Sequence, residues 1–276
     1  MSDRRTVVVT GGSDGIGAVT SRALAADGVD LIVVGRSETK LAAVAADTGA
    51  TTFSADFGVL DDVRALAARI AEHTTSIDVL LNNAGGTFDP VDRTVDGFEP
   101  NFQINHLAGF LLTNLLRERL TAGDGALVVN TSSMGNLLGR VDLTDLDGRR
   151  RAVGQPRAYG SSKLMNILFA KGITQRWASD GVIAAAVHPG VVASSFGRDS
   201  FWVGLAYRTP LRHLGTISPE KGAEPLIELA RRGADPAIGG VYFNRHRADG
   251  PQSRQARDQR LIDGLWEESA TLVGLD

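Results

Sequence analysis

The chain reads Thr10-Gly11-Gly12-Ser13-Asp14-Gly15-Ile16-Gly17 between an apolar run, residues 6–10, and an amphipathic stretch, residues 16–27. Glycines at such a junction let the backbone turn sharply and approach a diphosphate, while the first helical turn supplies N–H donors and the positive end of a dipole. The spacing differs from the G-x-G-x-x-G dinucleotide fingerprint, and Ala18 stands where a P-loop has Lys. The junction predicts a strand–turn–helix unit that either binds a nucleotide or is an ordinary tight turn.

The same alternation continues along the chain. Short apolar runs predict strands at 6–10, 31–34, 51–55, 79–81, 126–131, 183–187 and 241–243. Helical patterns lie at 16–27, 40–47, 59–73, 98–120, 158–179, from Ser218-Pro219 onward, and 255–272. Strands without polar alternation are typical of parallel sheets covered on both faces. We therefore expect an α/β fold, with residues 1–276 forming a single doubly wound Rossmann-fold domain whose mostly parallel sheet is flanked by helices.

Composition narrows the function classes. The 276 residues carry 29 Lys+Arg and 32 Asp+Glu, a net charge of −3, and 43% are apolar. A slightly acidic chain lacks the electrostatic footprint of a general nucleic-acid binder. The absence of cysteine excludes disulfides, thiolate nucleophiles and iron–sulfur clusters, and the five histidines suggest no metal site. No apolar run has the ~20 residues that span a bilayer, so we expect a cytoplasmic protein without stable membrane insertion.

The residue that ends the second strand bears on which nucleotide is bound. A carboxylate there would accept hydrogen bonds from a ribose 2′-hydroxyl, whereas arginine accommodates a 2′-phosphate. The chain has Gly35-Arg36-Ser37 and no acid before Glu38. Arg36 therefore favours NADP(H) over NAD(H), unless it is a solvated side chain at a helix start.

Three further segments point to a family. They are Asn82-Asn83-Ala84-Gly85, Tyr159-Gly160-Ser161-Ser162-Lys163 and His188-Pro189-Gly190. With the glycine-rich turn, in this order, they resemble the short-chain dehydrogenase/reductase family. The chain is most similar to the branch with retinol dehydrogenases and protochlorophyllide reductase, although Ala108-Gly109-Phe110 replaces the usual Gly-His-Phe.

The resemblance implies catalytic roles for Asn105, Ser133, Tyr159 and Lys163. Tyr159 and Lys163 are four residues apart and share one helix face, where an ammonium is expected to lower the Tyr159 pKa and make it a general acid/base. Ser133, rather than Ser132, would hydrogen-bond the substrate oxygen. Asn105 corresponds to the family asparagine that orders a water between Lys163 and bulk solvent.

The resemblance also implies a cofactor site along the predicted edge of the sheet. Asp56 would bind the adenine amine, and Ser194 stands where threonine is usual. The implied cofactor-binding residues are Gly11, Ser13, Asp14, Gly15, Ile16, Gly17, Arg36, Asp56, Phe57, Asn83, Ala84, Gly85, Tyr159, Lys163, Pro189, Gly190, Val192 and Ser194.

Two segments break the alternation. Residues 136–157 form an inserted loop that lengthens the spacing between Ser133 and Tyr159, and the apolar segment 194–217 is expected to cover a hydrophobic small-molecule substrate. The predicted activity is NADP(H)-dependent interconversion of a carbonyl and an alcohol. An NAD-dependent alcohol dehydrogenase, a non-catalytic NADP-sensing protein and a Rossmann methyltransferase are the alternatives. Homodimer, homotetramer and monomer all occur among the relatives implied.

Overall fold

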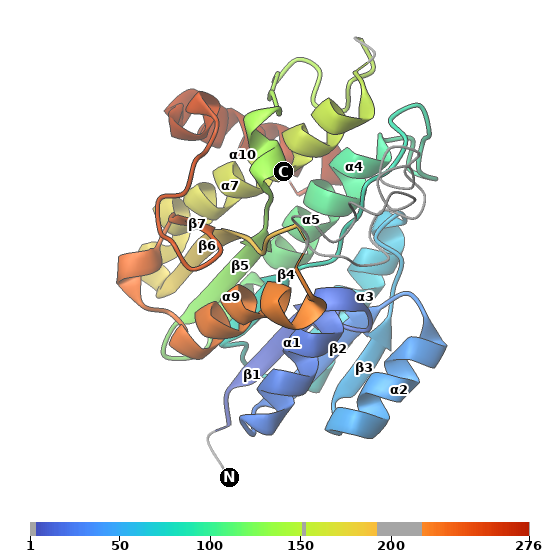
Figure 1. Cartoon of the computed structure of the whole chain (residues 1–276), viewed down its shortest axis with the longest axis vertical. Coiled ribbons are helices and arrows are strands. Elements are labelled where there is room, and N and C mark those ends of the chain that lie inside the picture. Colours follow the sequence, from blue (N-terminus) through green and yellow to red (C-terminus); the bar gives the residue numbers. More distant parts are fainter. Residues whose placement is uncertain (1–3, 151–152, 192–216, 276) are drawn as a thin grey trace.

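The computed structural model describes residues 4–150, 153–191 and 217–275, which are built around one seven-stranded sheet (Figure 1). The strands are β1 (Thr6–Thr10), β2 (Asp30–Gly35), β3 (Thr51–Ser54), β4 (Val79–Asn82), β5 (Ala126–Thr131), β6 (Val182–His188) and β7 (Tyr242–Asn244). Their order is β3-β2-β1-β4-β5-β6-β7, and every neighbouring pair is parallel. The predicted fold class is confirmed, with a sheet that is parallel throughout.

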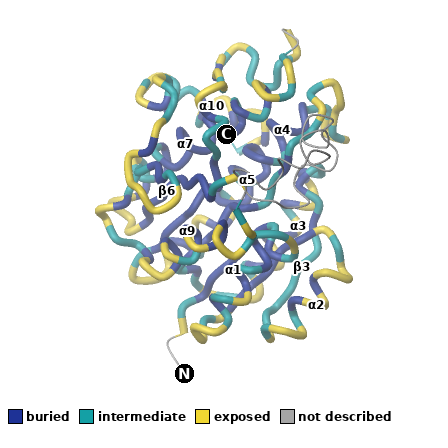
Figure 2. Tube along the Cα trace, viewed as in Figure 1, coloured by how far each residue is buried: buried dark blue, intermediate teal, exposed yellow. Residues whose placement is uncertain are grey.

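Helices cover both faces of the sheet. They are α1 (Gly15–Ala26), α2 (Glu38–Thr48), α3 (Leu60–His73), α4 (Pro100–Phe102), α5 (Ala108–Leu115), α6 (Arg117–Leu120), α7 (Gln155–Trp177), α9 (Pro219–Arg232) and α10 (Gln259–Val273). Apolar residues of α1, α2 and α9 pack in one cluster, and those of α3, α5, α7 and α10 pack in another. Val8 belongs to the second of these clusters and Val7 and Val9 belong to the first, and all three are fully buried, which explains why the strand lacks polar alternation. In Figure 2 the buried parts of the chain, in dark blue, lie in the middle of the molecule, and the exposed parts, in yellow, lie around them.

The predicted helical stretch over residues 98–120 is confirmed from Pro100 to Leu120, but it is not one regular α-helix. Glu99 caps the short α4 by accepting bonds from the backbone N–H groups of Asn101 and Phe102. A π-helical turn, η1 (Gln103–Leu107), then joins α4 to α5, and the chain kinks at Leu116 before α6. The break brings side chains of η1 toward the ends of the neighbouring strands, as described below.

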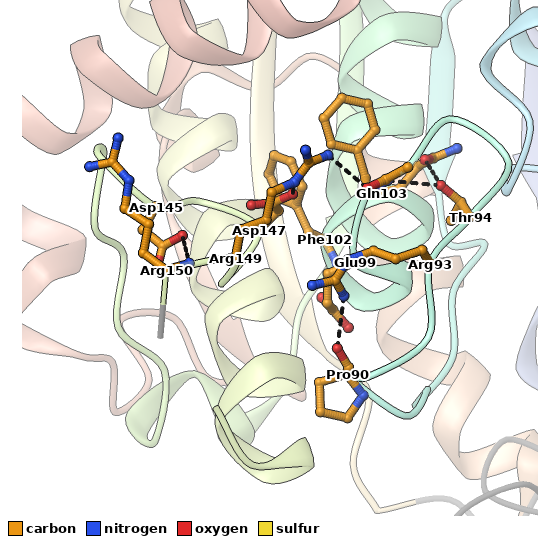
Figure 3. A network of polar contacts seen from close by, with 12 residues as sticks. Pro90, Arg93, Thr94, Glu99, Phe102, Gln103, Asp145, Asp147, Arg149 and Arg150 are labelled. Atoms are coloured by element: carbon orange, nitrogen blue, oxygen red, sulfur yellow. Dashed lines mark hydrogen bonds and ion pairs between the residues drawn. The ribbon is translucent and has the colours of Figure 1, made fainter. Parts of the chain in front are cut away.

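The inserted loop is shorter than predicted. Its first residues, Asn136 and Leu137, belong to a 3₁₀ helix, η2 (Met134–Leu137), and residues 155–157 form the first turn of α7. Val141 is buried and exchanges two hydrogen bonds with Gln255, each 2.9 Å long. At the other end of the loop, Arg149 pairs with Asp147 and donates to the Gly97 carbonyl at 2.7 Å (Figure 3). The insertion is thus tied to both the C-terminal region and the loop before α4.

The C-terminal helix covers α5 and α7. The Trp266 ring lies 5.2 Å from Phe110, 5.7 Å from Phe169 and 5.4 Å from Trp177, measured between ring centroids. Ser269 makes a 3.2 Å hydrogen bond with His106 of η1. Among the described residues, no helix is long and apolar enough to cross a membrane. The predicted substrate cover, 194–217, lies outside the described residues except for Ile217.

Candidate active site

The glycine-rich turn lies between β1 and α1 at the carboxyl edge of the sheet. Gly11 has a φ of +63°, and a Cβ atom there would lie 2.9 Å from the Ala84 Cα. A Cβ at Gly17 would collide with the Gly11 carbonyl oxygen. Both positions therefore need glycine, because the turn folds back on the start of α1 and against the segment after β4. Asp14 caps α1 by accepting a 2.8 Å bond from the Gly15 N–H.

Asn83 and Ala84 tie the turn to the middle of the sheet. The Asn83 side-chain amide donates to the Thr10 carbonyl at 3.0 Å, and the Thr10 hydroxyl accepts from the backbone N–H groups of Asn83 and Ala84. Asn83 is 8% exposed, and its oxygen accepts from the Thr131 hydroxyl at 3.4 Å. Its polar atoms are therefore engaged within the protein, which makes Asn83 a structural member of the site.

The adenosine end of the predicted site is polar and open. Arg36 is exposed at the end of β2, and Lys40 pairs with Asp14 at 2.5 Å across the turn. Asp56 accepts a 2.8 Å bond from the Gly58 N–H. Phe57 is buried, and its carbonyl accepts a 3.3 Å bond from the side chain of Gln103.

Ser133 and Tyr159 meet where β5 ends and α7 begins. The Ser133 hydroxyl accepts a 3.1 Å bond from the Gly135 N–H, and Tyr159 is half-buried. Burial raises the pKa of Tyr159, while a hydrogen bond with Ser133 lowers it. Ser132 points elsewhere, since its hydroxyl donates to the Lys163 carbonyl at 2.7 Å. Of the two serines, Ser133 is the one that shares a site with Tyr159.

Lys163 lies behind the tyrosine ring. Its Nζ atom is 5.5 Å from the Tyr159 ring centroid and donates to the Thr131 carbonyl at 3.3 Å. The side chain is 1% exposed, and burial lowers its pKa to about 7. The expectation that Lys163 lowers the Tyr159 pKa is wrong for this structure. Burial dominates for both groups, and Ser133 is the neighbour that lowers the tyrosine pKa.

Asn105, in η1, is joined to three segments of the site. Its side chain donates to the Gly86 carbonyl and the Ser162 hydroxyl, both at 3.0 Å, and accepts from the Gly86 N–H at 2.8 Å. Its carbonyl accepts a 3.0 Å bond from Asn166 of α7, whose amide also donates to the Thr131 carbonyl. Asn105 is therefore linked to Lys163 through the amide of Asn166 and the Thr131 carbonyl. The water that Asn105 is expected to order between Lys163 and bulk solvent stays a prediction.

The remaining predicted positions divide in two groups. Pro189 and Gly190 follow β6, and a Cβ at Gly190 would lie 2.5 Å from the Ile217 Cδ1. Val192 and Ser194 lie outside the described residues. The other implied residues lie at the carboxyl edge of β1 to β5, the edge where open α/β sheets bind ligands.

Several polar residues of the site were not found from the sequence. Asn136 and Asn166 lie three residues after Ser133 and Lys163, and both are buried with hydrogen bonds to backbone carbonyl groups of the site. Tyr242, on β7, is 1% exposed and bonds to Asn136. Their short spacing from the motifs was the available signal, but asparagine at such a spacing is equally typical of a surface turn.

Three features of this site are those that the resemblance implied for one enzyme family. They are the tight turn with Gly11 and Gly17, the contact between Ser133 and Tyr159, and the buried Lys163. The family model described as short chain dehydrogenase matches residues 5–201. The chain belongs to the short chain dehydrogenase family.

Named relatives extend the match over the whole chain. This short chain dehydrogenase is 36% identical to human retinol dehydrogenase 13, covering 99% of this chain and 85% of that protein. It is 39% identical to "Putative daunorubicin C-13 ketoreductase DnrU" of Streptomyces sp. (strain C5), covering 98% of this chain and 93% of that protein. A crystal structure of an uncharacterised protein from Mycobacterium paratuberculosis has a TM-score of 0.76 and 32% identity, covering 98% of this chain and 93% of that one.

Membership fixes the class of reaction. The short chain dehydrogenase is an NAD(P)-dependent oxidoreductase that acts on an alcohol or a carbonyl group. The described residues fit such a cofactor, because glycine at positions 11 and 17 lets the β1–α1 turn fold tightly at the N-terminus of α1, the end of a helix that binds phosphate groups.

Proposed function

We propose that this chain is an NADP(H)-dependent reductase of apolar aldehydes or ketones. The observation that carries the proposal is Tyr159, half-buried, hydrogen-bonded to Ser133 and 5.5 Å from the Nζ atom of Lys163. A phenol in this position can donate a proton to a carbonyl oxygen, and Ser133 can hold that oxygen as negative charge develops. The bound cofactor supplies the hydride.

Arg36 and its neighbours support the choice of NADP(H). Arg36 is an exposed guanidinium at the end of β2, where a 2′-phosphate would lie, and Lys40 adds a second cation. Asp14 offsets part of this charge through its ion pair with Lys40. The preference for NADP(H) over NAD(H) therefore depends mainly on Arg36.

An apolar substrate is supported by the side chains near Ser133 and Pro189. Leu137 and Leu138 follow the Ser133 turn and are 46% and 64% exposed, and Val191 is 62% exposed. Large exposed apolar side chains beside polar catalytic groups are typical of a site for an apolar ligand. The named relatives, retinol dehydrogenases and a ketoreductase, have names that refer to such compounds. We further propose that residues 1–276 act as one domain; the cytoplasmic location stays a prediction.

Calorimetric titration with NADPH and NADH tests the cofactor assignment. We expect tighter binding of NADPH, and Arg36→Leu should weaken NADPH binding about 10- to 100-fold, since it removes a charge-assisted contact, while leaving NADH unchanged. Equal affinities in the unmodified protein would favour the NAD-dependent alternative.

Turnover of decanal with NADPH tests the catalytic assignment. Tyr159→Phe keeps the ring but removes the proton donor, so kcat should fall at least about 100-fold, whereas the NADPH Kd should change much less because only one implied cofactor contact is lost. Binding of NADPH without turnover of any aldehyde, ketone or quinone would favour the NADP-sensing alternative. Undiminished turnover in the Tyr159→Phe variant would reject the role of Tyr159.

A further inference from the structure

Asn136 lies under the Ser133 turn and is fully buried. Its side-chain amide donates to the Ser133 carbonyl at 2.7 Å, and its backbone N–H donates to the same oxygen at 3.0 Å. These two hydrogen bonds from Asn136 to the Ser133 carbonyl stabilise the turn that carries the Ser133 side chain. The orientation of Ser133 toward Tyr159 therefore depends on where Asn136 is held.

Two segments distant in the sequence hold Asn136. The Ser253 N–H donates to its side-chain oxygen at 2.9 Å, and its amide nitrogen donates to the Tyr242 hydroxyl at 3.3 Å. The amide orientation is unambiguous, because a carbonyl on one side needs a donor and an N–H on the other needs an acceptor. Both N–H groups and the oxygen of the amide thus join the Ser133 turn to β7 and to the segment before η7 (Arg254–Arg257).

Tyr242 is close to the catalytic pair. It is 1% exposed, and burial raises the pKa of its hydroxyl, an effect that Asn136 opposes through its hydrogen bond and that the nearby Tyr159 reinforces. The raised pKa favours the neutral hydroxyl, which accepts the hydrogen bond from the Asn136 amide.

We propose that Asn136, supported by Tyr242, is a positioning residue that orients Ser133 toward Tyr159 and the substrate oxygen. This inference rests on the proposed function for its effect on turnover. Its structural part, the alignment of Ser133 with Tyr159, does not depend on any substrate.

A double-mutant cycle separates positioning from general stability. With decanal and NADPH, Asn136→Ala should lower kcat about 10-fold, because small displacements of a catalytic group are costly, without changing the NADPH Kd. In the Ser133→Ala background the same substitution should cost less than about 2-fold, since the group that it positions is already gone. Tyr242→Phe, which keeps the ring packed, should show a smaller loss with the same non-additivity. Equal losses in both backgrounds would overturn the proposal.

The pH dependence of kcat gives a second test of the positioning role. Among the residues that the structure describes, Lys163 and Tyr242 are titratable groups beside Tyr159. Because the Ser133 hydrogen bond lowers the Tyr159 pKa, losing its alignment should move the tyrosine limb of the profile to higher pH. A variant that is only destabilised would have a lower kcat at every pH, but the pKa that Tyr159 contributes to the profile would not move.

A spectroscopic readout keeps the inference testable if decanal is not turned over. The chain has three tyrosines, so ¹³Cζ-labelled tyrosine gives few signals, which Tyr159→Phe and Tyr242→Phe assign. At pH 7.5 the Tyr159 signal should move in the same direction in Asn136→Ala and Ser133→Ala. It should not move in the control Asn114→Ala, which removes an amide that bonds to the Phe110 carbonyl in α5. An unmoved Tyr159 signal in Asn136→Ala would reject the inference, whereas absent turnover in the unmodified protein would count against the proposed function alone.

Discussion

The amine of Lys163 is buried in the protein, whereas in water it would be charged at neutral pH. It is 1% exposed, and its pKa of about 7 means that the interior favours the neutral form. The unfolded chain keeps this lysine protonated up to a pH near its ordinary value of 10.5. Below pH 7 the folded protein must therefore hold a buried charge, and this lowers its stability.

Replacing Lys163 with methionine should stabilise the fold while abolishing activity. The gain in the free energy of unfolding should be largest at pH 6–7, on the order of 1–3 kcal/mol, and should shrink toward pH 10, where the unfolded lysine also becomes neutral. Urea unfolding of both proteins at pH 6, 8 and 10 measures this. A gain that is constant with pH would show that packing, not charge, is responsible.

The candidate catalytic residues could be predicted from the sequence, but the buried asparagines that hold them in place could not. Ser133, Tyr159 and Lys163 lie in short patterns that can be read locally, and the structure brings them together. Asn136 and Asn166 depend on contacts with partners up to 117 residues away, such as Ser253. No local pattern reports a hydrogen bond of that kind. The pKa direction for Tyr159 failed for the same reason, since burial depends on the whole surrounding structure.

At the scale of elements, the π-helical turn η1 links the two ends of the cofactor site. Gln103 donates to the Phe57 carbonyl, on the side where adenosine is expected, and at 2.7 Å to Asp96, which also accepts from the Leu60 N–H at the start of α3. Two residues later, Asn105 bonds to Gly86 near Lys163. A π turn commonly marks a functional site, and here it holds both amides toward the sheet edge.

Gln103→Met should loosen the adenosine side of the site. Methionine has a shape similar to that of glutamine, but it cannot donate the hydrogen bonds that Gln103 makes to the Phe57 carbonyl and to Asp96. The NADPH Kd should therefore rise about 3- to 10-fold. The kcat at saturating NADPH should change less than about 2-fold, because Tyr159 and Ser133 do not contact Gln103. Titration calorimetry and steady-state kinetics measure the two effects, with Gln175→Met, an exposed amide paired with Gln259, as the control. A fall in kcat with an unchanged Kd would contradict this role for η1.

Strands were easier to predict than helices. The apolar runs gave seven strands, with boundaries within about one residue of those observed, because strands buried on both faces are nearly uniform in composition. The helical stretch predicted over 98–120 is present from Pro100 onward, but its π turn and its kink at Leu116 were not predicted, because propensity does not encode Glu99 as a cap or the side-chain bonds of the turn. The loop predicted at 136–157 extended too far at both ends, into η2 and α7.

At the scale of the whole molecule, α10 covers α5 and α7. Ile262, Leu265 and Val273 of α10 are buried, and Trp266 fills the space between the aromatic side chains of α5 and α7. The insertion adds to this cover, because Leu143 packs against Gly264. Little apolar surface of α5 and α7 is left for a second copy.

We therefore expect the protein to be a monomer. Sedimentation velocity across a 100-fold range of concentration should give one species with the mass of a single chain. Trp266→Asp should expose the aromatic side chains of α5 and α7 and lead to self-association or loss of stability of about 3 kcal/mol or more. A concentration-independent dimer of the unmodified protein would contradict this expectation.

The strand order also bears on synthesis at the ribosome. Translation delivers β1 first, and β2 and β3 can then add outward on one side of it. β4 adds on the other side of β1, and each later strand adds beside the one made just before it. None of the seven described strands has to be inserted between two that are already paired. The sheet can therefore be completed by adding each new strand at a free edge as the nascent chain emerges. Each unfinished edge is exposed until the next strand arrives, and β7 is the last to close the series.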